Sequence, residues 1–323
     1  MNLNVIKGLL ALALSMLAGL VGAQAYPAQP IRMIVGFSAG SGTDAVARVL
    51  ADAMKDELGQ PVVIVNLPGA GSTLAAARAA AAAPDGYTLY FADSSHALAA
   101  SIYSKLPYDS VKDFQGIGFV STIPFAIVAG RSVPAGDLSQ FIQLARSSPG
   151  KFSYGSSGVG ATQHLFAETF ARQIGTRFLH VPFKSGIEAL NAVLAGDVDF
   201  TFFGVPPVLP HLQSGALKGF GVASATRTAF APNLPTIAEA GLPGFEASTW
   251  NMVLAPKGIE PKVAERLNQV ITKITGTDSF RQKIGTAGAI ASAGASPDQV
   301  TAYLAQEVSR WREAIKAAGV GAQ

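Results

Sequence analysis

Apolar and polar residues follow two alternating patterns along most of the chain. Short apolar runs rich in β-branched residues indicate buried strands, and the segments that follow them carry apolar residues at helical spacing. The first strands are predicted at 31–37, 62–65 and 87–91, and the first helices at 43–58, at 72–83 and from about 97. Alternating strands and helices predict an α/β fold with parallel-type sheets flanked by helices.

Two long extended segments, 116–130 and 250–255, interrupt this alternation. Between them the pattern restarts, with helices at 137–146, 161–173 and 187–195 and strands at 152–154, 178–181, 198–202 and 219–223. A chain that leaves one domain, builds a second and returns needs two such crossover segments. We therefore expect a discontinuous domain 1 (26–125 and 251–323) and a continuous domain 2 (126–250).

The C-terminal segment carries an apolar stripe at helical spacing. The stripe consists of Val300, Tyr303, Leu304, Val308, Trp311 and Ile315. We expect a helix that packs these side chains against the first domain.

Composition narrows the possible classes of protein. The formal net charge is +3 and no run of Lys or Arg occurs, which argues against a nucleic-acid partner. The chain has no cysteine, so disulfides, thiolate catalysis and cysteine-ligated zinc are excluded. Residues 1–25 combine Lys7, an apolar stretch and Ala23-Gln24-Ala25, which predicts a signal peptide cleaved after Ala25 and a periplasmic protein.

The transition from the first strand to the first helix predicts an anion site. Residues 38–42 are small and polar, and Thr43 or Asp44 is the expected N-cap of the helix. Backbone N–H groups at a helix start, together with the helix dipole, bind anions without a cationic side chain. Similar loops at 66–72, 93–96 and 155–162 follow other strands, so two facing domains would bring them to one cleft.

Two other chemistries match parts of these loops. Residues 40–45 (GSGTDA) match the dinucleotide fingerprint, but Asn66 stands where that fingerprint needs an acidic residue. Ser157 with His164 and a distant Asp suggests a serine hydrolase, although Val159 replaces the last glycine of G-x-S-x-G. The four histidines lack metal-pair spacing, and we expect neither a metal nor a cofactor.

Several side chains have two possible roles. Asp44 could bond a ligand or stabilise the first helical turn, and His164 could contact a ligand or a neighbouring loop. Lys184 could neutralise a second carboxylate or be solvated. Phe37, Phe183 and Phe203 could form aromatic cleft walls or belong to the core.

Taken together, these segments resemble those of a known family, the Bug-type periplasmic solute-binding proteins, which are receptors of tripartite tricarboxylate transporters. The motifs that carry the resemblance are IVGFSAGSGTDAVAR (34–48), NLPGAG (66–71), PDGY (84–87), LPYDSVKD (106–113), GSSGVGATQH (155–164), VPFKSG (181–186), AGDVD (195–199) and PTIAEAGLP (235–243). The resemblance implies a two-domain type II periplasmic-binding-protein, or Venus flytrap, fold that grips small carboxylates with loop groups.

Carried over by position, the resemblance implies a set of ligand-binding residues. They are Phe37, Ser38, Ala39, Gly40, Ser41, Gly42, Thr43, Asp44, Ser94, Ser95, Ser157, Gly158, Ala161, Thr162, Pro182, Phe183, Lys184, Phe203 and Gly204, to which the loop analysis adds His164. The family commonly has an Asp-Asn pair where Phe203-Gly204 stands. That departure indicates a less polar ligand, with an aromatic carboxylate as a candidate.

The expected function is capture of a small organic carboxylate by hinge closure and its delivery to the permease subunits of a membrane transporter. We expect a monomeric binding protein and no catalysis. The alternatives are an exported serine hydrolase using Ser157 and a ligand-sensing receptor that feeds a signalling partner.

Overall fold

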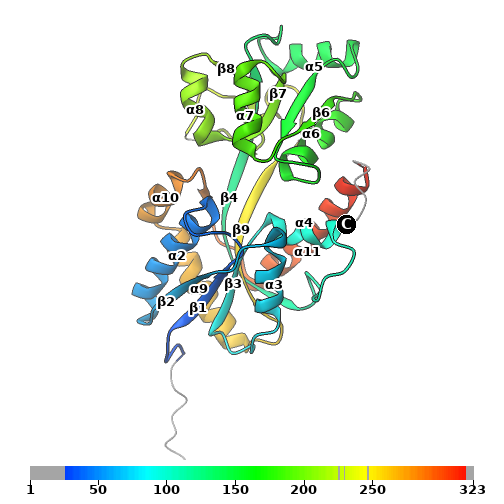
Figure 1. Cartoon of the computed structure of the whole chain (residues 1–323). Coiled ribbons are helices and arrows are strands. Elements are labelled where there is room, and N and C mark those ends of the chain that lie inside the picture. The colour runs from blue at the N-terminus through cyan, green and yellow to red at the C-terminus, as the bar shows by residue number, and fades with distance from the viewer. Residues whose placement is uncertain (1–25, 225, 229, 246, 318–323) are drawn as a thin grey trace, which may run out of the picture.

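The computed structural model describes residues 26–224, 226–228, 230–245 and 247–317, so the predicted signal peptide lies outside the described residues. Figure 1 shows an upper and a lower lobe joined by two long strands. No helix in the described part of the chain is both long enough and apolar enough to cross a membrane.

The lower lobe is built on a sheet with the order β2-β1-β3-β9-β4. Its parallel strands are β1 (Ile31–Val35), β2 (Val62–Asn66) and β3 (Thr88–Asp93). Its helices are α2 (Gly42–Leu58), α3 (Thr73–Ala80), α4 (Ser94–Ile102), α9 (Pro261–Thr275), α10 (Asp278–Gly285) and α11 (Pro297–Ala317), with a 3-10 turn η1 (Ala70–Ser72) and a short strand β10 (Ile290–Ala291). The predicted strand–helix alternation is confirmed here.

The upper lobe repeats this arrangement on a smaller sheet. Its strands are β5 (Ser153–Ser156), β6 (Leu179–Pro182), β7 (Phe200–Gly204) and β8 (Leu217–Val222). Its helices are α5 (Leu138–Ser147), α6 (Thr162–Gln173), α7 (Gly186–Ala195) and α8 (Val205–Gln213). Strand β5 pairs in parallel with β6 and β7.

The two crossover segments are antiparallel neighbours. Strand β4 (Phe114–Gly130) pairs with β9 (Ser248–Pro256) between Phe114 and Pro124, and with β7 and β8 from Phe125 to Gly130. Both strands run from one lobe to the other (Figure 1). The predicted crossovers are therefore confirmed, and they add antiparallel pairs to sheets that are otherwise parallel.

Aromatic packing fills the upper lobe and continues towards α11. The ring of Phe141 lies 5.3, 5.2 and 5.1 Å from those of Phe152, Phe200 and Phe220. Helix α11 contacts α4 and β4, and it also contacts α6 of the upper lobe. The predicted packing of this helix against the first domain is confirmed, and the ring of Trp311, 5.7 Å from that of Phe166, extends the contact to the upper lobe.

Two helix starts differ from the predictions, and one helix was not predicted. Ser41, rather than Thr43 or Asp44, caps α2, because its hydroxyl accepts a hydrogen bond from the Asp44 N–H. Helix α4 begins at Ser94 instead of 97, because Asp93 caps it. Helix α8 lies between the predicted strands 198–202 and 219–223, where no element was predicted; its Pro206 and Pro207 fall in the first helical turn, where proline is tolerated.

Candidate functional site

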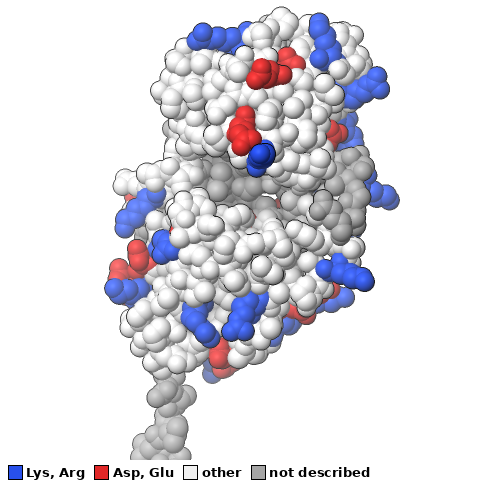
Figure 2. Space-filling model, viewed as in Figure 1, with Lys and Arg blue, Asp and Glu red and all other residues white. Residues whose placement is uncertain are grey.

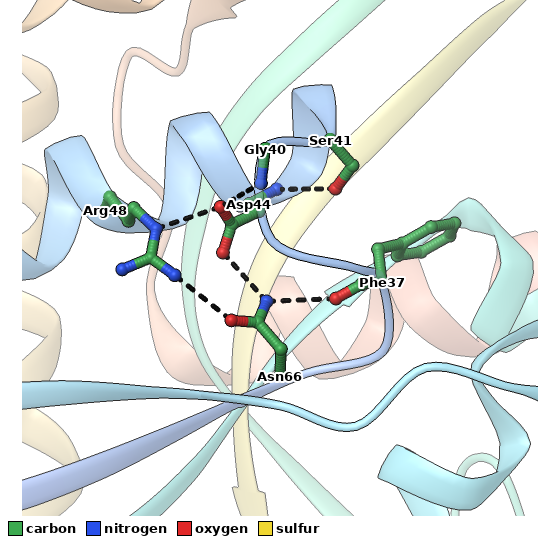
Figure 3. A network of polar contacts seen from close by, with 6 residues as sticks. All are labelled: Phe37, Gly40, Ser41, Asp44, Arg48 and Asn66. Carbon is green, nitrogen blue, oxygen red and sulfur yellow. Dashed lines mark hydrogen bonds and ion pairs between the residues drawn. The ribbon is translucent and has the colours of Figure 1, made fainter.

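The loop between β1 and α2 is held by a network of side-chain bonds centred on Asp44 (Figure 3). Asp44 Oδ2 accepts from the Gly40 N–H at 2.8 Å and from Arg48 Nε at 2.9 Å. Its Oδ1 accepts from Asn66 Nδ2 at 2.8 Å, and the same amide donates to the Phe37 carbonyl at 2.9 Å. The network ties the end of β1 to the end of β2.

Asp44 itself is buried, with 1% of its surface exposed. Burial alone would raise the pKa of its carboxyl, but hydrogen bonds from Arg48, Asn66 and the Gly40 N–H outweigh burial and hold that pKa below its ordinary value. Both oxygens are already engaged, so the structure assigns Asp44 the positioning of the loop.

The loop also uses some of its own amides. The Ser41 N–H donates to the Ser38 carbonyl, and the Gly40 and Asp44 N–H groups are bonded as described above. The N–H groups of Ser38, Ala39, Gly42 and Thr43 make no hydrogen bond to any described residue. These four amides are the ones left for a ligand.

Strand β3 ends at Asp93, which faces the same region. Asp93 Oδ1 accepts hydrogen bonds from the N–H and the hydroxyl of Ser95, the first at 3.0 Å. The Ser95 hydroxyl lies 3.1 Å from that of Ser72, which in turn donates to the Gly36 carbonyl. Burial raises the pKa of the Asp93 carboxyl to about 6, although the bonds from Ser95 lower it.

In the upper lobe, Gln163 organises the loop before α6. Its Oε1 accepts from the Ser157 N–H at 2.9 Å, and its Nε2 donates to the Phe202 carbonyl at 3.0 Å. The N-cap of α6 is Ala161, which has no side-chain acceptor. The first N–H groups of α6 therefore have no capping side chain at this end.

His164 lies behind this loop, in a stack with His180. Its Nδ1 accepts from the Gly160 N–H at 2.9 Å, and the two imidazole centroids are 4.2 Å apart. His180 Nε2 lies 2.7 Å from the Ser156 hydroxyl. Burial and the neighbouring His164 lower the pKa of His180 to about 4, and burial lowers the pKa of His164.

A cavity of about 570 Å³ lies between the lobes and brings these loops together. Its walls are Phe37, Gly71, Asp93, Ser94, Ser95, Leu98, Phe125, Ser157, Ala161, Thr162, Gln163, Gly186, Phe203, Gly204 and Thr249. On the face drawn in Figure 2, the hollow between the lobes is bordered mainly by uncharged residues.

The structure brings some of the predicted site residues to this cavity and not others. The predicted residues that line it are Phe37, Ser94, Ser95, Ser157, Ala161, Thr162, Phe203 and Gly204. The predicted residues outside its lining are Ser38, Ala39, Gly40, Ser41, Gly42, Thr43, Asp44, Gly158, His164, Pro182, Phe183 and Lys184. Lys184 is exposed, and its N–H donates to Glu188 Oε2 at 3.2 Å.

Sequence reasoning missed several wall residues. They are Gly71, Asp93, Leu98, Phe125, Gln163, Gly186 and Thr249. Asp93 belongs to a loop that was singled out, and its position after an apolar strand was the available signal. Phe125 and Thr249 come from the crossover strands, whose buried patterns do not show which side chains face a cavity.

The charge distribution of the cavity is unusual for an anion site. Its described lining contains one carboxylate, that of Asp93, and no Lys or Arg. Helices α4, α6, α7 and α8 begin at its wall, and a helix start presents partial positive charge. Helix starts and backbone amides are thus the source of positive potential for a bound anion.

The described residues offer no support for metal or hydrolytic chemistry. No group of three or more His, Asp or Glu side chains among them is placed to hold a metal ion. The histidine bonded to a serine in this region is His180, whose partner is Ser156. His164, the proposed base for Ser157, is bonded to Gly160 instead.

The profile of the tripartite tricarboxylate transporter family receptors matches residues 46–320 of this chain. The chain belongs to this receptor family. Protein BugT of Bordetella pertussis is 35% identical over 305 residues, which cover 94% of this chain and 93% of BugT. The receptor is a solute-binding protein and not an enzyme.

Solved structures place the fold among periplasmic binding proteins. The receptor resembles the periplasmic binding protein BugD with a TM-score of 0.72 and 32% identity, over 92% of this chain and 100% of BugD. It resembles an R. palustris protein solved with adipate with a TM-score of 0.75 and 31% identity, over 92% and 100% of the two chains. The predicted two-domain flytrap fold is therefore confirmed.

Proposed function

We propose that this receptor captures a small organic carboxylate between its lobes and delivers it to the permease subunits of a tripartite transporter. The observation that carries the proposal is the cavity of about 570 Å³, whose walls come from both lobes and from several helix starts. A carboxylate there meets amide donors without a cationic side chain. The R. palustris relative solved with adipate supports this class of ligand.

Closure is the proposed mechanism of capture. The lobes are joined by β4 and β9, and we place the hinge where β4 changes partners, between Pro124 and Phe125. A ligand that touches both lobes stabilises the closed form, because only that form provides the full set of contacts. On this proposal domain 1 comprises 26–125 and 251–323, and domain 2 comprises 126–250.

The carboxylate is held by amides on two sides of the cleft. In the lower lobe these are the unused amides of residues 38–43, which lie outside the cavity lining and reach the ligand on closure. In the upper lobe they are those of Val159 and Thr162, because the N–H groups of Ser157, Gly158, Gly160 and Ala161 already donate within the chain. Phe37, Phe125 and Phe203 line the cavity and provide apolar surface for the rest of the ligand. Aromatic acids are therefore included among the candidate ligands.

The proposal extends to the cell compartment and the assembly. Residues 1–25 act as a signal peptide cleaved after Ala25, and the mature receptor is a periplasmic monomer. Mass measurement of the exported protein checks the cleavage site, and light scattering checks the monomer. A mature N-terminus other than Tyr26 would contradict the first point.

The test is a thermal-shift screen of the mature receptor against dicarboxylates, tricarboxylates, amino acids and aromatic acids, followed by calorimetry. A selective ligand raises the melting temperature in proportion to the logarithm of its concentration over its dissociation constant. Micromolar binding corresponds to about −8 kcal/mol. A receptor that none of these acids stabilises would overturn the proposal.

A further inference from the structure

The lower-lobe wall of the cavity contains a carboxylate that the capture of an acid does not require. Asp93 lines the cavity and belongs to the C-terminal end of β3. Its Oδ1 is used by Ser95 and its own N–H donates to the carboxylate, whereas Oδ2 accepts no hydrogen bond from another described residue. One oxygen is thus available to a bound molecule.

No cation in the described lining of the cavity offsets this carboxylate. The other polar side chains of the wall are Ser94, Ser95, Ser157, Thr162, Gln163 and Thr249, all of them uncharged. Burial raises the pKa of Asp93 to about 6, so the group is mainly ionised at pH 7.5. A second carboxylate placed beside Asp93 would meet a like charge in a partly desolvated site, which costs affinity.

We propose that Asp93 selects carboxylates that carry a hydrogen-bond donor at their other end, an ammonium or a hydroxyl group, over plain dicarboxylates. The donor group of the ligand binds Asp93 Oδ2 at the lower-lobe wall, and like-charge repulsion keeps the carboxylate of the ligand away from Asp93. This inference rests on the proposed function and names its substrate class as amino and hydroxy acids.

Helix capping explains why a carboxylate is stable at position 93, in the cavity wall. As the N-cap of α4, it receives the Ser95 N–H and lies at the positive end of that helix. These interactions stabilise the ionised form that a donor group recognises. Because the negative charge of Asp93 already occupies the start of α4, a carboxylate of the ligand would bind weakly there.

Two matched sets of probes test the inference at pH 7.5 by calorimetry. The aliphatic set is 6-aminohexanoate, adipate and hexanoate, and the aromatic set is 4-aminomethylbenzoate, terephthalate and benzoate. In the better-bound set we expect the amine to bind about tenfold more tightly than the diacid, a difference of about 1.4 kcal/mol. Asp93→Asn should reverse this order, since the amide neither repels an acid nor attracts an ammonium.

Asp137→Asn is the matched control, because Asp137 is also a helix N-cap, accepting from the Gln140 N–H at the start of α5, and is exposed outside the cavity. It should leave the affinities for the amine and the diacid unchanged.

Asp93→Ser, which keeps a capping hydroxyl, should reproduce the reversal if Asp93→Asn folds poorly. A wild-type preference for the diacid, or an unchanged order in the folded variants, would overturn the inference and leave the proposed function standing. Failure of wild type to bind any of the six probes or any acid of the screen would instead overturn the proposed function.

Discussion

Asn66 donates to Asp44 across 2.8 Å, and this bond joins the first turn of α2 to the end of β2. The two residues are 22 positions apart and belong to different strand–helix units. Their contact fixes residues 37–44, whose remaining amides are proposed to meet the ligand.

Removal of the Asp44 carboxylate should therefore weaken binding through the loop. Asp44→Ala leaves the Gly40 N–H without its acceptor and removes one of the two acceptors of the Asn66 amide, which should lower stability by about 1–3 kcal/mol and affinity by about tenfold. Urea unfolding and calorimetry measure the two effects. Asp56→Ala, at an exposed position of the same helix, is the control. Unchanged affinity in Asp44→Ala would show that the loop does not take part in ligand binding.

Gly36 is tightly packed against Ser72. A Cβ atom added at Gly36 would lie 2.4 Å from Ser72 Oγ and 3.0 Å from its Cα, so Gly36→Ala must displace the η1 turn. We expect a loss of about 1–3 kcal/mol in the free energy of unfolding. Gly42→Ala has open space within 4 Å and should be neutral or slightly stabilising. Equal effects of the two substitutions on denaturant unfolding would contradict the packing argument.

Substitution of Gln163 should weaken ligand binding, because its side chain holds the upper-lobe loop in place. Gln163→Leu removes both the acceptor for the Ser157 N–H and the donor to Phe202, and it should loosen the upper-lobe loop. The expected result is about tenfold weaker binding by calorimetry. Gln173→Leu changes an exposed position on the same helix and serves as the control; if both variants bind alike, Gln163 does not position the loop.

The partly buried stack of His164 and His180 should make stability depend on pH. Folding lowers the pKa of His180 from 6.5 to about 4, so the unfolded chain takes up a proton first as the pH falls through this range. This histidine therefore contributes stability above pH 6.5 that is lost towards pH 4. Asp93 has a raised pKa and contributes with the opposite sign, so the informative quantity is the difference between wild type and His180→Gln. Parallel pH profiles of the free energy of unfolding would show that His180 does not titrate as described.

Local patterns were sufficient for much of this fold. The apolar runs and the small loops after them predicted most strands and helices, because both signals lie within a few adjacent residues. The crossover strands were also visible, since their apolar runs are longer than those of the other strands.

Contacts between distant segments could not be predicted in the same way. In the sequence, Asp44 is as suitable for contacting a ligand as for positioning the loop. Only the positions of Asn66 and Arg48 in the structure show that both of its carboxylate oxygens already accept hydrogen bonds. Gln163 and Asp93 were missed for the related reason that a cavity wall depends on which side chains the opposite lobe brings near. Helix α8 was not predicted, and its two prolines are no guide, because proline is common both in turns and in a first helical turn.

A crystal structure of the receptor with its bound acid would test capture between the lobes. We expect closed lobes, with the carboxylate oxygens within about 3 Å of backbone N–H groups from both lobes. A ligand that touches one lobe only, or that lies outside the cavity between Phe37 and Phe203, would contradict it.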